Sequence, residues 1–207
     1  MKGSIVVCVM VSYFEGCLRL RNRNNLVVLA QSMVVLILTG GYGLEGSCGL
    51  VVGDIVSRLE QKGIEHHVFR NDSTILPIIG VPDCWNSDAV KQLKDLASSS
   101  SAIIMVSPEY HGTMSSTMKL QLDWLSKDEM SRKPIGLVSL LGGTSNTSTL
   151  NHMRHVCRWL GAICIPEQIA IPEGRTHLED GKISNPDLSN RLDTLIDSLL
   201  EITDKLS

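Results

Sequence analysis

Short apolar runs recur along this sequence, and they constrain its fold more than any other feature. They lie at residues 33–41 (MVVLILTGG), 66–69 (HHVF), 102–108 (AIIMVSP), 134–143 (PIGLVSLLGG) and 162–171 (AICIPEQIAI). A strand that lacks polar alternation has to be covered on both faces, and such strands are typical of parallel sheets. Helical spacing of apolar residues lies between the runs, at 50–59, 90–97, 118–125 and 150–160. We therefore predict an α/β fold, in which a five-stranded parallel sheet carries helices on both faces.

A long helix is predicted at the C-terminal end of the chain. Asn185 is a suitable N-cap, and Pro186 fits the first helical turn. An apolar stripe follows, made of Leu188, Leu192, Leu195, Leu199, Ile202 and Leu206. We expect this helix to close one face of the sheet.

The first 32 residues do not continue this pattern. The apolar stretch SIVVCVMVSYF is too short to span a bilayer, and RLRNRNN interrupts it with three arginines. Glu15 stands where a signal peptide would need small residues for cleavage. We predict that residues 1–32 are a poorly ordered extension or an artefact of start-site assignment, with Met33 as the alternative start. An additional edge strand at Ile5–Val11 is the other interpretation. Residues 33–207 are then the single domain.

Net charge and cysteine content indicate which partners to expect and in which cellular compartment the protein works. Lys and Arg total 19 against 22 acidic residues, and the net charge of -3 is not gathered into blocks. Neither a nucleic acid nor a membrane is therefore an expected partner. The six cysteines form no CxxC pair; they are Cys8, Cys17, Cys48, Cys84, Cys157 and Cys164. Reduced thiols in a cytoplasmic protein are the simplest interpretation.

The loop Thr39–Gly49, which follows the first run, is a candidate phosphate site. Doubly wound sheets bind ligands at the carboxyl ends of their strands, beside the point where strand order reverses. Glycines at 40, 41, 43, 46 and 49 permit tight turns, and Ser47 stands where the next helix begins, a position that favours phosphate. Gly41, Gly43 and Gly46 also match the dinucleotide pattern G-x-G-x-x-G, but the acidic residue that should end the second strand is displaced to Asp72. A glycine-rich turn without a ligand is the third interpretation.

The loops after the third and fourth runs carry a resemblance to a known family. PEYHGTMSSTMKLQLDW is similar to the signature Pro-Glu-Tyr-Asn-x-x-x-x-x-x-Leu-Lys-Asn-x-x-Asp-Trp of the NADPH-dependent FMN reductase family, a flavodoxin-like group. The matching residues are Pro108, Glu109, Tyr110, Lys119, Asp123 and Trp124. The pairs Leu76-Pro77, Gly142-Gly143 and Met153-Arg154, and the triplet Leu160-Gly161-Ala162, also fall where the family has similar residues.

This resemblance implies a flavodoxin-like three-layer sandwich with strand order 2-1-3-4-5 and bound FMN. The implied cofactor-binding residues are Gly41, Tyr42, Gly43, Gly46, Ser47 and Cys48 around the phosphate; Pro108, Glu109, Tyr110, His111 and Gly112 along the ring; and Gly142, Gly143, Thr144 and Ser145 at its pyrimidine edge. Cys48 also reads as a small buried packing residue, and His111 as an ordinary turn histidine. Catalytic acid or base residues are not required, because hydride passes directly from NADPH or NADH to the flavin.

The sequence departs from the family at three places. Its phosphate loop usually reads Gly-Ser-x-Arg-x-x-Ser, but here Tyr42 replaces the first Ser and Leu44 the Arg, with Glu45 beside it. His111 replaces an Asn, and Ser115-Ser116 replace Pro-Gly. A missing guanidinium removes a charge-assisted bond of roughly 1.5 to 3 kcal/mol.

We expect an NAD(P)H-dependent, FMN-containing reductase that passes electrons to a small diffusible acceptor: a quinone, an azo compound, a metal oxyanion or free flavin. A flavodoxin-type electron carrier is one alternative, although carriers are usually strongly acidic. A module that keeps the fold but has lost tight FMN binding is the other.

The sequence also predicts the surroundings of two further helix faces. Leu120 and Trp124 form a second apolar stripe, which predicts the interface of a homodimer or a dimer of dimers. His152, His155 and Trp159 lie opposite a core stripe, which predicts a solvated or interface face and no metal site.

Overall fold

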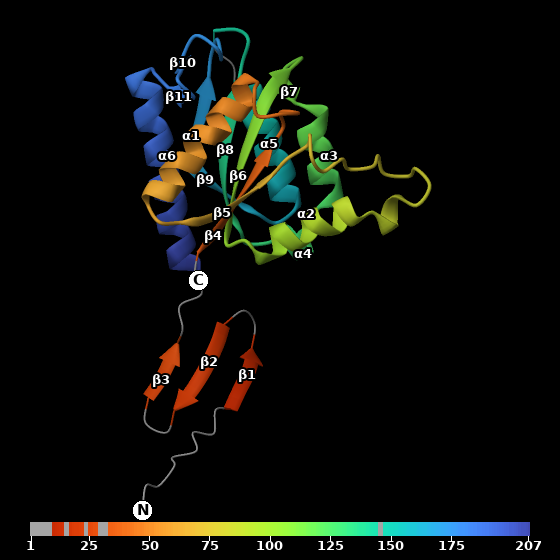
Figure 1. Cartoon of the computed structure of the whole chain (residues 1–207), viewed down its shortest axis with the longest axis vertical. Helices are drawn as coiled ribbons and strands as arrows, with labels where there is room; N and C mark the ends of the chain where they lie inside the picture. Colours follow the sequence, from red (N-terminus) through yellow and green to blue (C-terminus); the bar gives the residue numbers. More distant parts are fainter. Residues whose placement is uncertain (1–9, 15–16, 23–24, 29–32, 145–146) are drawn as a thin grey trace, which may run out of the picture. The chain divides into compact units, whose positions relative to one another are not determined.

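The computed structural model describes residues 10–14, 17–22, 25–28, 33–144 and 147–207. The chain divides into two compact units, residues 1–32 and residues 33–207. In the first unit β1 (Met10–Phe14), β2 (Cys17–Asn22) and β3 (Asn25–Val28) form an antiparallel sheet in that order (Figure 1). The edge strand considered at Ile5–Val11 lies largely outside the described residues, and its end, Met10–Val11, pairs with β2.

The second unit is built on a parallel sheet, as predicted. Its strands are β4 (Val34–Thr39), β5 (Glu65–Phe69), β6 (Ala102–Tyr110), β8 (Pro134–Leu140) and β9 (Ile163–Ile171). They lie in the order β5-β4-β6-β8-β9, and every neighbouring pair is parallel. Numbered along the domain, this is the expected order 2-1-3-4-5. The sheet has one addition, the short strand β7 (Thr113–Met114), which runs antiparallel to the end of β6.

Helices cover both faces of this sheet (Figure 1). One face is packed against α1 (Ser47–Gln61) and α6 (Pro186–Leu206). The other face is packed against α2 (Asp88–Ser99), α3 (Ser116–Trp124), α4 (Lys127–Met130) and α5 (Ser148–Trp159). Shorter elements are the 3-10 turn η1 (Cys84–Asn86) and the hairpin of β10 (Leu178–Glu179) and β11 (Lys182–Ile183).

The apolar runs become buried strands because each strand supplies both cores. Along β4, Val35 and Ile37 face α1 and α6, whereas Leu36 and Leu38 face the opposite helices, and all four are fully buried. Side chains alternate between the faces of a strand, so a continuous apolar run fills two cores at once. The capping expected for the last helix is also present, since the Asn185 side chain accepts bonds from the Asp187 and Leu188 amides.

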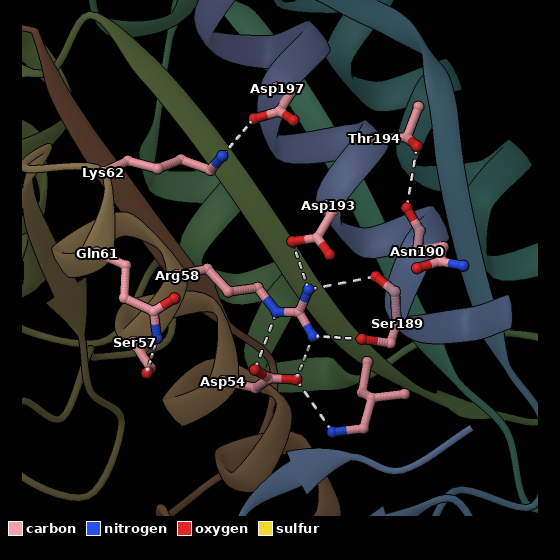
Figure 2. Close-up of polar contacts among 11 residues, drawn as sticks. Asp54, Ser57, Arg58, Gln61, Lys62, Ser189, Asn190, Asp193, Thr194 and Asp197 are labelled. Carbon is pink, nitrogen blue, oxygen red and sulfur yellow. Dashed lines mark hydrogen bonds and ion pairs between the residues drawn. The ribbon is translucent and has the colours of Figure 1, made fainter. Parts of the chain in front are cut away.

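A polar network joins the two helices on the α1 side of the sheet (Figure 2). Arg58 of α1 donates to Asp54, one turn earlier, at 2.9 Å and forms an ion pair with Asp193 of α6 at 2.5 Å. It also donates to the Ser189 hydroxyl at 2.8 Å. Asp54 is itself buried and accepts the backbone amide of Ile183 in β11 at 3.0 Å. The network therefore fixes α1, α6 and the β10–β11 hairpin to one another.

Among the described helices, none combines the length and apolar composition that crossing a bilayer requires.

Candidate functional site

A cleft of about 1040 Å³ opens at the carboxyl edge of the parallel sheet. The end of β6 and the segments that follow β4, β8 and β9 line it, so the parallel sheet positions every part of its wall. The lining residues are Gly41, Tyr42, Gly43, Gly46, Ser47, Cys48, Pro108, Glu109, Tyr110, Leu140, Leu141, Gly142, Glu173, Gly174, Arg175 and Thr176. The volume is in the range of small-molecule and cofactor sites.

The structure brings together the predicted residues of all three loops. Every predicted residue of the first loop lines the cleft, together with Pro108, Glu109 and Tyr110 of the second and Gly142 of the third. His111, Gly112, Gly143 and Thr144 are not among the lining residues, although each directly follows the lining part of its loop. Ser145 lies outside the described residues.

The first loop ends at the N-terminus of α1. Gly46 is the N-cap and offers no side chain, and no acidic residue lies in the first turn. The amides of that turn are therefore available to an anion, and the helix dipole favours negative charge there. Gly41 packs against the same turn, since a Cβ at this position would lie 2.9 Å from the Cβ of Cys48. These features fit a phosphate group.

Two side chains distant in sequence hold the first loop in place. Asn71 donates to the carbonyls of Thr39 and Gly41, both at 2.6 Å. Gln121 of α3 donates to the Thr39 carbonyl and to the Asn71 side chain, both at 2.8 Å. Both side chains are buried, so these bonds are shielded from water. Neither residue could be identified from the sequence, because no local pattern marks a side chain that bonds a loop from another element.

The dinucleotide interpretation of this loop finds no support at Asp72. That carboxylate would have to bind a ribose, but Arg70 donates to it at 3.1 and 2.7 Å. The bonds from Arg70 also lower the pKa of Asp72. Asp72 therefore already has a partner.

Cys48 is a packing residue, in agreement with the simpler of the two expectations. Its thiol is buried, lies 3.3 Å from the Thr39 hydroxyl and donates to the Val106 carbonyl at 3.5 Å. Burial raises the pKa of the Cys48 thiol, although bonds from Thr39 and from the Gly41 and Gly40 backbone act in the opposite direction. The thiol therefore stays protonated at neutral pH and is no nucleophile.

The strand before the second loop is longer than the apolar run that predicted it. The run ends at Pro108, but β6 continues to Tyr110, and Glu109 and Tyr110 pair with Met114 and Thr113 of β7. Proline is tolerated there because it lies at the end of the ladder, where it needs to donate no bond. The turn is formed by His111 and Gly112, with φ of 52° and 76°. Tyr110 projects into solvent at the cleft and is 60% exposed.

The substitution of Ser115-Ser116 for Pro-Gly has a structural explanation. Ser115 is the N-cap of α3 and accepts the Met118 amide at 3.1 Å. Its hydroxyl also donates to the Gly40 carbonyl at 2.8 Å, and Thr117 donates to the same oxygen at 2.5 Å. These residues join the second loop to the first.

A fourth loop, residues 172–176, completes the cleft. Its residues were not predicted from the sequence as part of the site. It is bonded to the third loop: the Gly174 amide donates to Leu141 at 3.0 Å and the Glu173 amide to Gly143 at 3.1 Å. The sequence did contain a signal for this loop. The fifth apolar run ends at the same sheet edge as the others, where ligands bind, and it is followed by PEGR.

Trp124 does not form the expected second surface. It is buried within the chain, donates from Nε1 to the Pro77 carbonyl at 2.8 Å and meets the Trp85 ring edge-on at 5.1 Å between centroids. The residue 70–87 segment thus covers the second stripe of α3, and Leu120 is half-buried against the core. The expectation that an interface covers Trp124 was therefore wrong.

The outward face of α5 is exposed, as predicted. His152, His155 and Trp159 are all exposed, and the Trp159 side chain is 77% accessible. Within the described ranges, no three His, Cys, Asp or Glu side chains gather in a geometry that could hold a metal ion.

This chain is similar to known proteins both in sequence and in fold. The sequence model of the family described as NADPH-dependent FMN reductase matches residues 33–176. The chain is 35% identical over 97 residues to an NADPH azoreductase of Bacillus sp. (strain OY1-2), covering 46% of this chain and 53% of that protein. It is 28% identical over 177 residues to the NADPH-dependent FMN reductase ArsH of Rhizobium meliloti (strain 1021), covering 82% and 71%. The match to the azoreductase thus spans about half of that protein.

Solved structures share the fold. The flavoenzyme NAD(P)H:(acceptor) oxidoreductase FerB of Paracoccus denitrificans superposes with a TM-score of 0.71 at 17% identity, covering 84% of this chain and 98% of that one. A flavodoxin from the domain Archaea superposes with a TM-score of 0.51 at 15% identity, covering 82% and 98%. The predicted flavodoxin-like architecture is confirmed.

Proposed function

Because the chain belongs to the NADPH-dependent FMN reductase family, we propose that its cleft binds FMN and that it passes electrons from NAD(P)H to a small diffusible acceptor. One observation supports this most directly: glycine-rich loops from separate strands converge on a single cleft, beside a helix N-terminus that offers its amides to an anion. The acceptor class is a quinone, an azo compound, a metal oxyanion or free flavin.

The residues that would hold FMN follow from the cleft wall. Its phosphate would lie against Gly41, Gly43, Gly46 and Ser47 at the start of α1. Its ring would lie between the second and third loops, with Pro108, Glu109 and Tyr110 on one side and Gly142 on the other. The roles of Tyr42 and Cys48, and of His111, Gly112, Gly143, Thr144 and Ser145, remain predictions from the family resemblance.

When bound, FMN supplies the capacity to accept a hydride from nicotinamide and to release electrons to an acceptor. The protein's own contribution is binding, orientation and the polarity around the ring. Glu109 is held for such a role, since the Thr149 hydroxyl donates to its carboxylate at 2.8 Å. Asp123 of the family signature is exposed on α3, where Lys119 donates to its carboxylate.

The proposal is tested by the visible spectrum of the purified protein. We expect flavin absorbance bands that survive desalting, and bleaching of these bands by NADPH or NADH under anaerobic conditions. Addition of an azo dye or a quinone should then restore the bands. Bound flavin that neither nucleotide bleaches would instead support the electron carrier, and no flavin binding at any FMN concentration would support the module without a cofactor.

We also propose a homodimer or a dimer of dimers. Support comes from an exposed apolar stretch in the segment before α2, where Ile75, Ile78, Ile79, Val81 and Trp85 are between 41% and 73% exposed. Exposed apolar side chains at this density mark interaction surfaces. Sedimentation velocity would test this, and a monomer at micromolar concentration would contradict it.

A cytoplasmic location is part of the same proposal. The described cysteines Cys48, Cys84, Cys157 and Cys164 are free thiols, which suits a reducing compartment.

A further inference from the structure

Arg175 is the cationic side chain of the cleft. Among the described residues that line the cleft, the others with a charge are the carboxylates Glu109 and Glu173. Glu109 is occupied by the Thr149 hydroxyl. An anionic ligand in this cleft therefore has Arg175 as its positively charged side-chain partner.

The first loop lacks a cation that its relatives would supply. By resemblance to the family, an Arg belongs at the position of Leu44, and Glu45 adds a negative charge beside it. The amides of α1 remain, but an anion held by amides alone forgoes the stronger charge-assisted bonds. A phosphate bound here would thus lack a guanidinium from its own loop.

The fourth loop brings the backbone of Arg175 close to the N-terminus of α1, where the phosphate would bind. A Cβ on Gly174 would lie 3.8 Å from the Cβ of Ser47, the first residue of α1. Arg175 directly follows Gly174, so its backbone stands beside the N-terminus of α1. A guanidinium on a side chain of this length can reach a group bound at that N-terminus.

The guanidinium is available for a ligand. Arg175 is exposed, and within the described part of the chain its side chain makes no hydrogen bond or ion pair. Several arginines of the domain are engaged, as Arg58 is with Asp54 and Arg154 with Gln168. Arg132 and Arg158 make no side-chain bond within the described residues either, but neither lines the cleft. An arginine without a structural partner that lines a cleft is well placed to bind an anion.

The loop that carries Arg175 is fixed at both ends. Its start is bonded to the third loop through Gly174 and Glu173. Its end leads into the β10–β11 hairpin, where the Ile183 amide donates to Asp54, a member of the network in Figure 2. The position of the Arg175 backbone is therefore set before a ligand arrives, which lowers the entropic cost of binding.

We propose that Arg175 binds the phosphate group of FMN and replaces, from the loop after β9, the guanidinium that the loop after β4 lacks. This inference rests on the proposed function. A phosphate monoester is also present in NADPH, and the experiment below distinguishes the two sources. The position beside Ser47 favours FMN, because the phosphate loop itself ends there.

Direct binding measurements test the inference without relying on turnover. Apo-protein is titrated with FMN and, separately, with riboflavin, which has no phosphate, and the quenching of flavin fluorescence is followed. We expect Arg175→Gln to weaken FMN binding about 10- to 100-fold and to leave riboflavin binding unchanged. Arg175→Lys should show an intermediate loss, because an ammonium keeps the charge but not the bidentate fork.

Arg158→Gln is the matched control. Arg158 is exposed in the last turn of α5 and does not line the cleft, so the variant changes the net charge equally. Its FMN affinity should equal that of the unmodified protein. Urea midpoints of all variants should agree, since Arg175 is exposed and makes no structural bond.

Each other outcome overturns the inference. Equal FMN affinity of Arg175→Gln and the unmodified protein does so directly. Equal weakening of FMN and riboflavin would show that Arg175 supports the loop and not the phosphate. Unchanged FMN binding, together with weaker binding of NADPH but not of NADH in a parallel titration of the FMN-loaded variant, would assign the residue to the nicotinamide nucleotide. Failure of the unmodified protein to bind FMN would overturn the proposed function as well, which the other outcomes leave intact.

Discussion

At the scale of single residues, the unusual feature is the loop after β4, for which we propose a phosphate-binding role. Tyr42 and Leu44 occupy positions where the family resemblance predicts Ser and Arg, and both are partly exposed. Tyr42 lines the cleft but Leu44 does not. Because Leu44 is 38% exposed, a longer side chain at this position would not disturb the core.

This loop yields a first prediction. Leu44→Arg should tighten FMN binding about tenfold, because it restores a charge-assisted bond to the phosphate. Riboflavin binding should not change. Fluorescence titration measures both, and Leu206→Arg, at an exposed position near the end of α6, is the control. Tightening of riboflavin binding to the same degree would show that the gain does not come from the phosphate.

Single residues also show which contacts of the site could be predicted from the sequence and which could not. Gly46 and Ser47 could be placed at a helix start because capping is a local pattern. Asn71 and Gln121 could not be assigned to the same loop, since their bonds to Thr39 join residues 32 and 82 positions apart. Only the packing of β5 and α3 against β4 brings these side chains to that carbonyl.

At the scale of elements, the orientation of α1 determines the position of the loop after β4, because the loop leads directly into this helix. The helix contains a buried carboxylate, Asp54, which accepts bonds from Arg58 and from the Ile183 amide in β11. Removal of one member of a buried network leaves the others without partners, which costs more than the loss of an exposed pair.

A second prediction follows from this network. Asp54→Asn should lower the free energy of unfolding by about 2 to 4 kcal/mol, as measured by urea denaturation. Lys91 and Asp95 form a pair with the same spacing on α2, but both side chains are exposed. Asp95→Asn should therefore leave the free energy of unfolding almost unchanged. Similar losses in the two variants would contradict the structural role of Asp54.

The short helix α4 is held by a capping box. The Ser126 hydroxyl and amide both donate to Glu129, at 2.8 and 2.7 Å, and Lys94 lies 3.6 Å from the same carboxyl group. Burial acts to raise the pKa of Glu129, but the bonds from Ser126 and the charge of Lys94 outweigh it, and the pKa is lowered from its ordinary value of 4.5. The folded state therefore binds this proton less readily than the unfolded state does.

A third prediction concerns pH. A lowered folded pKa stabilises the protein above the unfolded value, and this contribution is lost as the pH falls through the folded pKa. Glu129→Gln keeps a residue suited to the capping box but removes the charge. The difference in urea midpoint between the unmodified protein and this variant should be full at about pH 7 and should shrink below about pH 4. A difference that stays constant over this range would contradict the assignment.

Elements differed in how well they could be predicted. The five parallel strands and the long helices were predicted because each has enough residues to show a period. The strand β7 and the β10–β11 hairpin were not, since each strand has two residues and is defined only by its partner. The missed elements matter to the site, because β7 sets the second loop and the hairpin fixes the fourth.

At the scale of the whole molecule, we propose that residues 33–207 form the unit that folds and binds. Residues 33–207 are compact by themselves, and the family match begins at residue 33. The described strands of residues 1–32 pair with one another. The proposal therefore assigns no part of the cleft to the first unit.

A fourth prediction tests this division. A chain that begins at Met33 should have the same urea midpoint and the same FMN affinity as the full chain. Circular dichroism during denaturation and fluorescence titration measure the two quantities. A loss of either would show that residues 1–32 contribute to the domain.

The sequence by itself determined the layered α/β architecture, the strand order through family resemblance, and three of the loops at the ligand edge. These features could be predicted because each depends on a local sequence pattern: an apolar run that fills two cores, a capping residue or a spaced motif. The tertiary structure alone decided that Trp124 is covered by its own chain, that Asn71 and Gln121 hold the loop after β4, and that the loop carrying Arg175 passes beside Ser47 at Gly174. Each of these depends on contacts between residues far apart in sequence, whose side chains meet only after the sheet and its helices have packed.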